Sequence, residues 1–173
     1  GQIHVDNLAH WILKPNEIQH DLRYFLKNGL PAVRSPKSFE AALSIAHEVF
    51  ELTQTEVSGE QSFDMFNIFL APFAKGLPEP RLRDALYQFL TSMRRDLFSN
   101  RAAPGLSLGL EFAVPDFLYD AEAIGHGGQT AGVYGDYVDE AGLITRLIVE
   151  SALEASSAKP LFNPRLIFKL RRK

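Results

Sequence analysis

Hydrophobic side chains recur every three or four residues along two long stretches of the chain. In the first, Ser35 followed by Pro36 is a typical helix start, and the period continues to Val57. In the second, the same period follows Pro80 and continues to Phe98. We therefore predict two amphipathic helices. Their apolar stripes consist of Phe39, Leu43, Ala46, Phe50 and Val57 in the first, and of Leu82, Leu86, Phe89, Leu90, Met93 and Leu97 in the second.

Shorter patterns predict the remaining elements. Apolar residues three or four apart indicate a helix from Glu17 to Asn28, ended by Gly29, and Asp139 is placed to cap a further helix. The block 63–73 has no clean period, so helix and buried strand both stay open there, and Pro72 indicates an end or a kink. Alternating polar and apolar residues predict strands over residues 2–6, 106–112 and 166–170.

The order of these elements indicates the fold class. Strands separated by helical connections imply an α/β fold with crossovers. The chain has 173 residues, of which 46 % are hydrophobic and 23 % charged, which is typical of one globular domain, and we expect a single domain over residues 1–173. Three predicted strands are too few to close a barrel, because even the eight-strand versions need far more chain.

Charge and hydropathy exclude several classes of partner. The formal net charge is −3, so no overall positive field favours nucleic acid or an anionic membrane. The basic run 169–173 is interpreted as a solubilising tail or a truncation point, in preference to a nucleic-acid arm. The longest apolar stretch, Phe66 to Ala74, is far shorter than the ~20 residues that span a bilayer. The first 15 residues carry His4, Asp6, His10 and Lys14 instead of a signal-peptide core, so we expect a cytoplasmic protein.

Candidate chemistry is limited by the side chains present. The chain has no cysteine, which excludes disulfides, thiolate metal sites and any thiyl or cysteine-nucleophile step within it. His4, Asp6, His10 and His20 have no recognised metal-ligand spacing, so we expect no metal site. The loop Gly125 to Thr130 offers backbone N–H groups but no following Gly-Lys-Ser/Thr, and is interpreted as a flexible surface loop.

Several segments, in one collinear order, point to a known family. They run from Gln19-His20-Asp21-Leu22-Arg23, through Leu70-Ala71-Pro72-Phe73, to Pro160-Leu161-Phe162-Asn163-Pro164. The chain resembles the anaerobic, glycyl-radical ribonucleoside-triphosphate reductases along nearly all of its length. The resemblance is to the archaeal-type branch in the segments 110–112, 114–118, 132–136 and 160–164. Further matching segments are 3–8, 14–15, 28–30, 58–62 and 67–74.

The resemblance implies a ten-stranded α/β barrel, a glycyl radical made by a separate activating enzyme, and a thiyl radical on a cysteine that attacks the ribose. This chain has no cysteine, stops before the family's radical segment, and departs from the family pattern over 102–107. We therefore expect a helix-rich partial barrel, too short to close, that is a pseudoenzyme without catalytic residues or cofactor of its own.

Two other interpretations stay open. In one, the chain is one half of a split reductase whose radical residues lie on another chain. In the other, it is a structural module that dimerises through the two long helices. The expected partners are accordingly a second copy or a complementary reductase chain, with a nucleotide as possible ligand.

The polar residues of the matching motifs are the candidate nucleotide-binding residues. Arg23 is suited to hold a phosphate bidentately, while His20 and Gln61 are suited to directional hydrogen bonds. The alternative is that Asp21 and Arg23 flank a helix face and that Gln61 and Asn67 satisfy buried backbone groups. The full candidate set is Gln19, His20, Asp21, Arg23, Gln61, Ser62 and Asn67.

Overall fold

A four-stranded parallel sheet organises the chain. The computed structural model describes residues 14–99, 105–157 and 163–170, so the strand predicted at 2–6 lies outside the described residues. The strand order is β1-β2-β3-β6, with every neighbouring pair parallel. The α/β class with crossover connections is therefore confirmed. The strands are β1 (Glu17–His20), β2 (Glu60–Phe63), β3 (Gly105–Glu111) and β6 (Arg165–Lys169).

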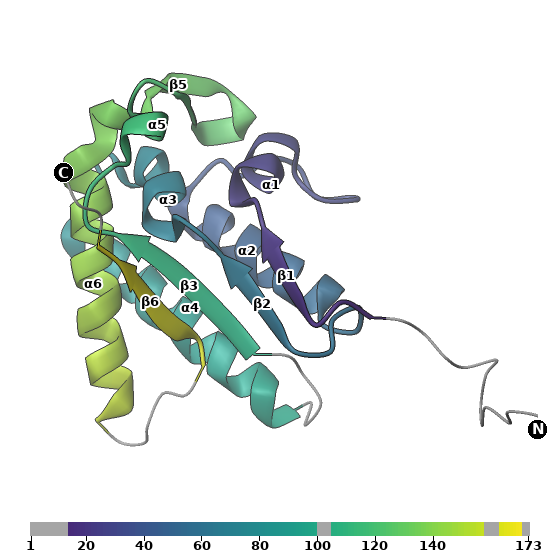
Figure 1. The fold of residues 1–173 in the computed structure, drawn as a ribbon. Helices are drawn as coiled ribbons and strands as arrows, with labels where there is room; N and C mark the ends of the chain where they lie inside the picture. Colours follow the sequence, from purple (N-terminus) through teal and green to yellow (C-terminus); the bar gives the residue numbers. More distant parts are fainter. Residues whose placement is uncertain (1–13, 100–104, 158–162, 171–173) are drawn as a thin grey trace, which may run out of the picture.

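Helices cover one face of this sheet and leave the other face without a helix (Figure 1). A small antiparallel hairpin and two 3-10 turns lie beyond the strand ends. None of the helices, over the residues that the structure describes, has the length and apolarity to cross a membrane. The helices are α1 (Leu22–Asn28), α2 (Phe39–Thr53), α3 (Phe66–Ala74), α4 (Glu79–Ser99), α5 (Asp116–Tyr119) and α6 (Val138–Ser156); the hairpin is β4 (Glu122–Ile124) with β5 (Thr130–Val133), and the turns are η2 (His126–Gly128) and η3 (Tyr134–Tyr137).

The hydrophobic core lies between the sheet and the helices. Phe66 at the start of α3 is fully buried, stacks on Phe89 of α4 at 5.4 Å between ring centroids, and lies 6.1 Å from Phe63 of β2. All nine residues of α3 are buried, which explains why residues 66–74 show no helical period. The core-facing residues of β3 are Leu106, Leu108 and Leu110.

Side chains alternate between the two faces of a strand, so the uncovered face carries the polar residues Glu60, Ser107, Arg165 and Lys169, with the exposed Ile167 between the last two. Ser107 of β3 donates to Glu60 of β2, and Arg165 of β6 donates to the same carboxylate. Two rows further along the same face, Lys169 of β6 lies 2.5 Å from Asp64. Lys169 is thus part of the sheet, and the interpretation of 169–173 as a solubilising tail is wrong for this residue.

Four predicted boundaries are wrong in detail. Residues 17–20 are strand, since Glu17 to His20 pair with β2, and only Leu22 onward is helical. Ser38 caps α2 by accepting from Ala41 N, whereas Ser35 donates to Lys27 O. The first long helix ends at Thr53, before Val57, and α6 begins at Val138 with Tyr137 as its N-cap, so Asp139 lies in the first turn.

The glycine-rich segment is not a free surface loop. Gly127 N donates to Pro36 O at 2.7 Å, which attaches the segment to the chain between α1 and α2. Gly128 has φ +74°, and a Cβ there would lie 2.2 Å from Lys27 O. Glycine is needed at this position both for the left-handed backbone and for the close approach of two chain segments. The segment therefore packs against the C-terminal end of α1.

An ion pair joins α2 to α4 and gives the fold one pH-dependent contact. Arg81 donates from Nε to Glu40 Oε1 at 2.6 Å and from Nη2 to Oε2 at 3.2 Å, and these hydrogen bonds lower the pKa of Glu40 to about 2. The two side chains are 53 % and 41 % exposed, so screening limits the contribution of the pair to about 1 kcal/mol or less.

We expect Arg81→Gln to lower the free energy of unfolding by under about 1 kcal/mol at pH 7. Because the folded pKa of Glu40 lies below its ordinary value of 4.5, this difference is fully present above pH 4.5 and disappears as the pH falls to about 2. Urea unfolding of both proteins across this range checks it. A difference that does not change with pH would show that the pair is not its source.

Candidate functional site

The clearest cavity beside polar side chains opens where β1 and β2 end. It has a volume of about 400 Å³. The carboxyl ends of parallel strands are the edge of the sheet where α/β proteins bind their ligands. Residues of β1, α1, α3 and α5 meet here because each of these elements begins or ends at this edge. The lining residues are Gln19, His20, Asp21, Arg23, Asp64, Met65, Phe69, Phe117, Leu118 and Ala121.

His20, the last residue of β1, lies at the base of the cavity. Its side chain is mostly buried, with 7 % of the residue exposed, and it packs against the rings of Phe25 and Phe63. Its Nε2 lies 2.7 Å from Gln61 Oε1. Burial lowers the pKa of His20, and the hydrogen bond to Gln61 only partly opposes this effect. The imidazole is therefore neutral at pH 7.

Arg23 forms one wall of the cavity in an ion pair with Asp21. Its Nε and Nη2 donate to the two carboxylate oxygens of Asp21 at 3.0 and 2.8 Å, and its guanidinium lies 4.9 Å from the centre of the Phe69 ring. Asp21 also caps α1 by accepting from Arg23 N. The hydrogen bonds from Arg23 to Asp21 raise the pKa of the arginine, which stays charged. The Nε/Nη2 edge of the guanidinium is thus occupied by Asp21.

The segment after β2 forms the opposite wall. Met65 has a left-handed backbone, with φ 52° and ψ 34°, directly between Asp64 and the first residue of α3. Asp64 accepts from Met65 N at 3.0 Å and pairs with Lys169 through its other oxygen. A non-glycine residue in this conformation costs about 1 kcal/mol or more, and such strain is common at binding sites.

The structure separates the seven predicted residues into three groups. Gln19, His20, Asp21 and Arg23 line the cavity, and Gln61 lies directly behind His20. Ser62 lies in the strand row between Gln19 and Ser107 and does not line the cavity. Asn67 is fully buried away from it and hydrogen-bonds β3 to α6.

Sequence reasoning missed most of the cavity's apolar wall. Asp64 and Met65 follow β2 directly, so identifying 60–63 as a strand would have indicated them as strand-end residues. Phe117 and Leu118 belong to a segment already noted for its family resemblance. Phe69 and Ala121 had no distinguishing signal.

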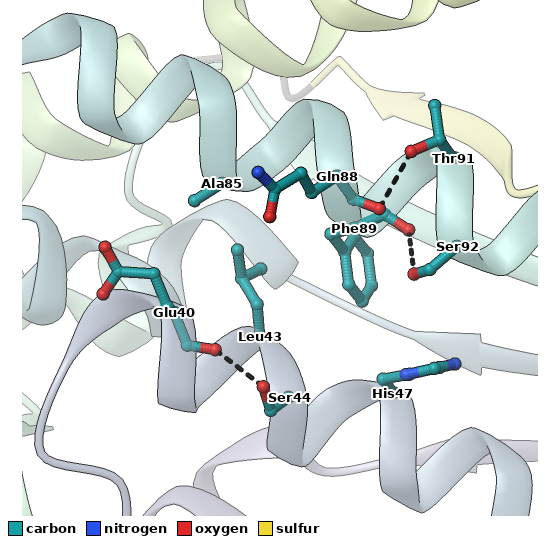
Figure 2. A pocket seen from close by; sticks show the side chains of 9 residues that line it. All are labelled: Glu40, Leu43, Ser44, His47, Ala85, Gln88, Phe89, Thr91 and Ser92. Carbon is teal, nitrogen blue, oxygen red and sulfur yellow. Dashed lines mark hydrogen bonds between the residues drawn. The ribbon is translucent and has the colours of Figure 1, made fainter.

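A second cavity lies between α2 and α4. It also has a volume of about 400 Å³. Figure 2 shows Glu40, Ser44 and His47 on one helix facing Gln88 and Ser92 on the other, with Ser44, Thr91 and Ser92 each bonded to backbone carbonyls of their own helix. This groove is polar, but it has no aspartate, lysine or arginine among its lining residues.

No group of three histidine, cysteine, aspartate or glutamate side chains is close enough to hold a metal ion within residues 14–99, 105–157 and 163–170. The chemistry available at the strand-end cavity is therefore hydrogen bonding from neutral and paired charged groups. The class that the fold defines is an α/β segment with an open parallel sheet and a cavity at the carboxyl ends of its strands.

Comparison with known proteins identifies the family. The model of the family described as anaerobic ribonucleoside-triphosphate reductase matches residues 1–173, so the chain belongs to this family. A search of curated protein sequences found no significant match.

Solved structures share the fold at low sequence identity. The anaerobic ribonucleotide reductase from Thermotoga maritima with citrate in the active site superposes with a TM-score of 0.69 at 16 % identity, over 93 % of this chain and 31 % of that one. The same enzyme with dATP in the specificity site gives 0.70 at 16 %, over 93 % and 29 %. Its complex with dATP and CTP gives 0.65 at 13 %, over 84 % and 26 %. The chain thus has the fold of a part of these enzymes and spans less than a third of their length.

Proposed function

We propose that the chain forms one part of the substrate barrel of an anaerobic ribonucleoside-triphosphate reductase, with the strand-end cavity as its ligand-binding wall. The family supports the reaction, and the position of the cavity at the carboxyl ends of β1 and β2 supports the site. That position is the single observation that carries the proposal.

The chain's share of the reaction is binding. Thiyl chemistry needs a cysteine, and none of the 173 residues is one. We therefore propose that the radical-bearing residues lie outside these 173 residues. They belong either to a complementary reductase chain or to further sequence of the same chain. A pseudoenzyme that binds a nucleotide without reducing it is the alternative. A full-length reductase gene or an activase gene beside this one would favour a chain that works with separate radical-bearing residues over a pseudoenzyme.

Calorimetry with CTP at millimolar concentration tests the binding role. We expect heat from the wild-type chain, and we expect Ala121→Phe, which fills the strand-end cavity, to weaken binding at least tenfold. Ala85→Phe is the matched control, because it places the same side chain in the groove between α2 and α4. Circular dichroism confirms that each variant is folded.

The outcomes separate the two cavities. Loss in Ala121→Phe with binding kept in Ala85→Phe supports the proposal. The reverse pattern would assign the nucleotide to the helix groove, and absence of heat from the folded wild-type chain would remove nucleotide binding.

The groove between α2 and α4 supports a second role, self-association. In the Thermotoga enzyme dATP occupies a specificity site. We propose that the two long helices form the contact with a second copy or with a complementary reductase chain, with the polar groove at that contact. Light scattering on the purified chain gives the oligomeric state, and a monomer at high micromolar concentration would contradict the homodimer.

Two finer assignments belong to the same proposal. The segments 114–118, 132–136 and 160–164 support the archaeal-type branch of the family. A cytoplasmic location is the expectation that accompanies an enzyme of nucleotide metabolism.

A further inference from the structure

A chain of buried hydrogen bonds lies behind the strand-end cavity and does not contact it except through His20. Gln61 Oε1 lies 2.7 Å from His20 Nε2 and 2.5 Å from Thr53 Oγ1, whose one proton faces two acceptors, Gln61 Oε1 and Val49 O at 2.6 Å. Gln61 is fully buried, and Thr53 is the last residue of α2. Three elements, β1, β2 and α2, are therefore joined at one amide.

The orientation of the Gln61 amide is set from its other end. Gln61 Nε2 donates to the Phe50 carbonyl at 3.1 Å. Rotating the amide by half a turn would bring two acceptor oxygens to this distance, which is unfavourable in a buried place. The bond to Phe50 therefore favours the orientation in which the carbonyl oxygen of Gln61 faces His20 and Thr53.

This orientation determines the protonation of the His20 ring. A carboxamide oxygen only accepts hydrogen bonds, so His20 Nε2 must carry the proton that lies between them. In a neutral imidazole the other nitrogen, Nδ1, then has a free lone pair and is an acceptor. Nδ1 has no hydrogen-bond partner in the described part of the chain, and His20 lines the cavity.

The charged groups around the cavity do not favour a phosphate at this point. Arg23 is the one lysine or arginine among the described lining residues, and Asp21 occupies its Nε and Nη2. Asp64 pairs with Lys169. Each aspartate that lines the cavity is thus neutralised by its own cation, Asp21 by Arg23 and Asp64 by Lys169. An anionic group beside His20 Nδ1 would meet a lone pair and no unpaired cation among the described lining residues, whereas a hydroxyl donor would meet an acceptor.

We propose that Gln61 is a positioning residue that fixes His20 in its Nε2–H tautomer, so that Nδ1 accepts a hydrogen bond from an uncharged hydroxyl of the ligand, as a sugar or polyol provides. The ligand half of this inference rests on the proposed function, which places the ligand in this cavity. The tautomer half does not depend on any ligand.

Long-range ¹H–¹⁵N NMR on the ¹⁵N-histidine-labelled chain at pH 7 tests the tautomer directly. His20→Asn identifies the resonances among the five histidines. We expect a protonated Nε2 and an unprotonated Nδ1 for His20. An Nδ1–H tautomer, or an equal mixture of the two, overturns the inference without involving nucleotide binding.

Two variants separate positioning from a merely structural role. Gln61→Met removes the acceptor at similar length and is expected to give a mixture of His20 tautomers. Thr53→Val is the matched control, because it removes a hydroxyl of the same cluster but keeps the His20–Gln61 bond, and it should leave the tautomer unchanged.

In Gln61→Glu the carboxylate should keep Nε2 protonated and raise the pKa of His20 above that of the wild type. From α2 and β2 only the neutral Thr53 and Gln61 hydrogen-bond to the ring, while Asp21 and Arg23 beside it pair with each other.

If Gln61→Met keeps a single Nε2–H tautomer, Gln61 does not set it. If Gln61→Met does not fold, the wild-type spectrum and the direction of the pKa change in Gln61→Glu decide the question. An unchanged or lowered pKa in Gln61→Glu counts against the proposal.

Adenosine and 9-methyladenine, which has no hydroxyl, test the ligand half at millimolar concentration. We expect adenosine to shift the His20 Nδ1 resonance at least twice as far as 9-methyladenine does. Equal shifts, or no shift with adenosine, overturn the hydroxyl contact. Absence of heat with CTP in a chain whose His20 is the Nε2–H tautomer would instead refute the proposed function alone.

Discussion

Asn67→Leu is expected to lower the free energy of unfolding by about 3 kcal/mol. Asn67 Oδ1 accepts from Glu111 N at 3.0 Å, and its Nδ2 donates to Glu111 O at 2.8 Å and to Thr145 Oγ1 at 2.8 Å. Leucine has a similar volume but leaves the backbone N–H and C=O of Glu111 without these partners in a buried place. Each such group costs about 1–3 kcal/mol.

Chemical denaturation measures this loss, and the melting temperature should fall by about 6–12 °C for a chain of this size. Asn28→Leu is the control. Its amide donates to Tyr24 O at the exposed end of α1, so the change should be below about 1 kcal/mol. Equal effects of the two substitutions would show that the buried hydrogen bonds of Asn67 do not join β3 to α6 as described.

Phe66→Ala is expected to cost about 3–5 kcal/mol. The Phe66 ring is fully buried between Phe63 of the sheet and Phe89 of α4. Removing it opens a cavity at the centre of the core and also ends the stacked contact with Phe89, and these two losses add. Urea or guanidinium unfolding with an unchanged slope would give the difference.

Leu52→Ala is the control for this prediction, because Leu52 lies on α2 with 62 % of its surface exposed. We expect that substitution to change stability by less than about 0.5 kcal/mol. A Phe66→Ala variant that is as stable as Leu52→Ala would mean that the sheet and α4 do not share one core.

The sequence predicted the elements whose pattern is determined by one buried face. The helix α4 has one face toward the core, and the strands β3 and β6 point alternate side chains toward it. Their hydrophobic periods are therefore visible in the sequence. The sequence did not predict α3, because a helix buried all round shows no period, and it misassigned β1, because four residues alternate too briefly to outweigh the helical spacing of Ile18 and Leu22.

The candidate site was predictable in part for a different reason. Gln19, His20, Asp21 and Arg23 were found through the family resemblance, and these four line the cavity. Three-dimensional partners were not visible in the sequence. Nothing near Arg23 shows that Asp21 occupies its Nε and Nη2. Nothing near Asn67 shows that it bonds to residues 44 and 78 positions away. Whether any of the seven residues contacts a ligand stays a prediction.

The measurement that tests the central claim most directly is a ¹H–¹⁵N NMR titration of the chain with CTP, with shifts assigned residue by residue. The account predicts that the amides of His20, Arg23, Asp64 and Phe69 shift together at the strand-end cavity. Shifts confined to Ser44, His47 and Gln88, in the groove between α2 and α4, would contradict it, as would a spectrum that millimolar CTP leaves unchanged.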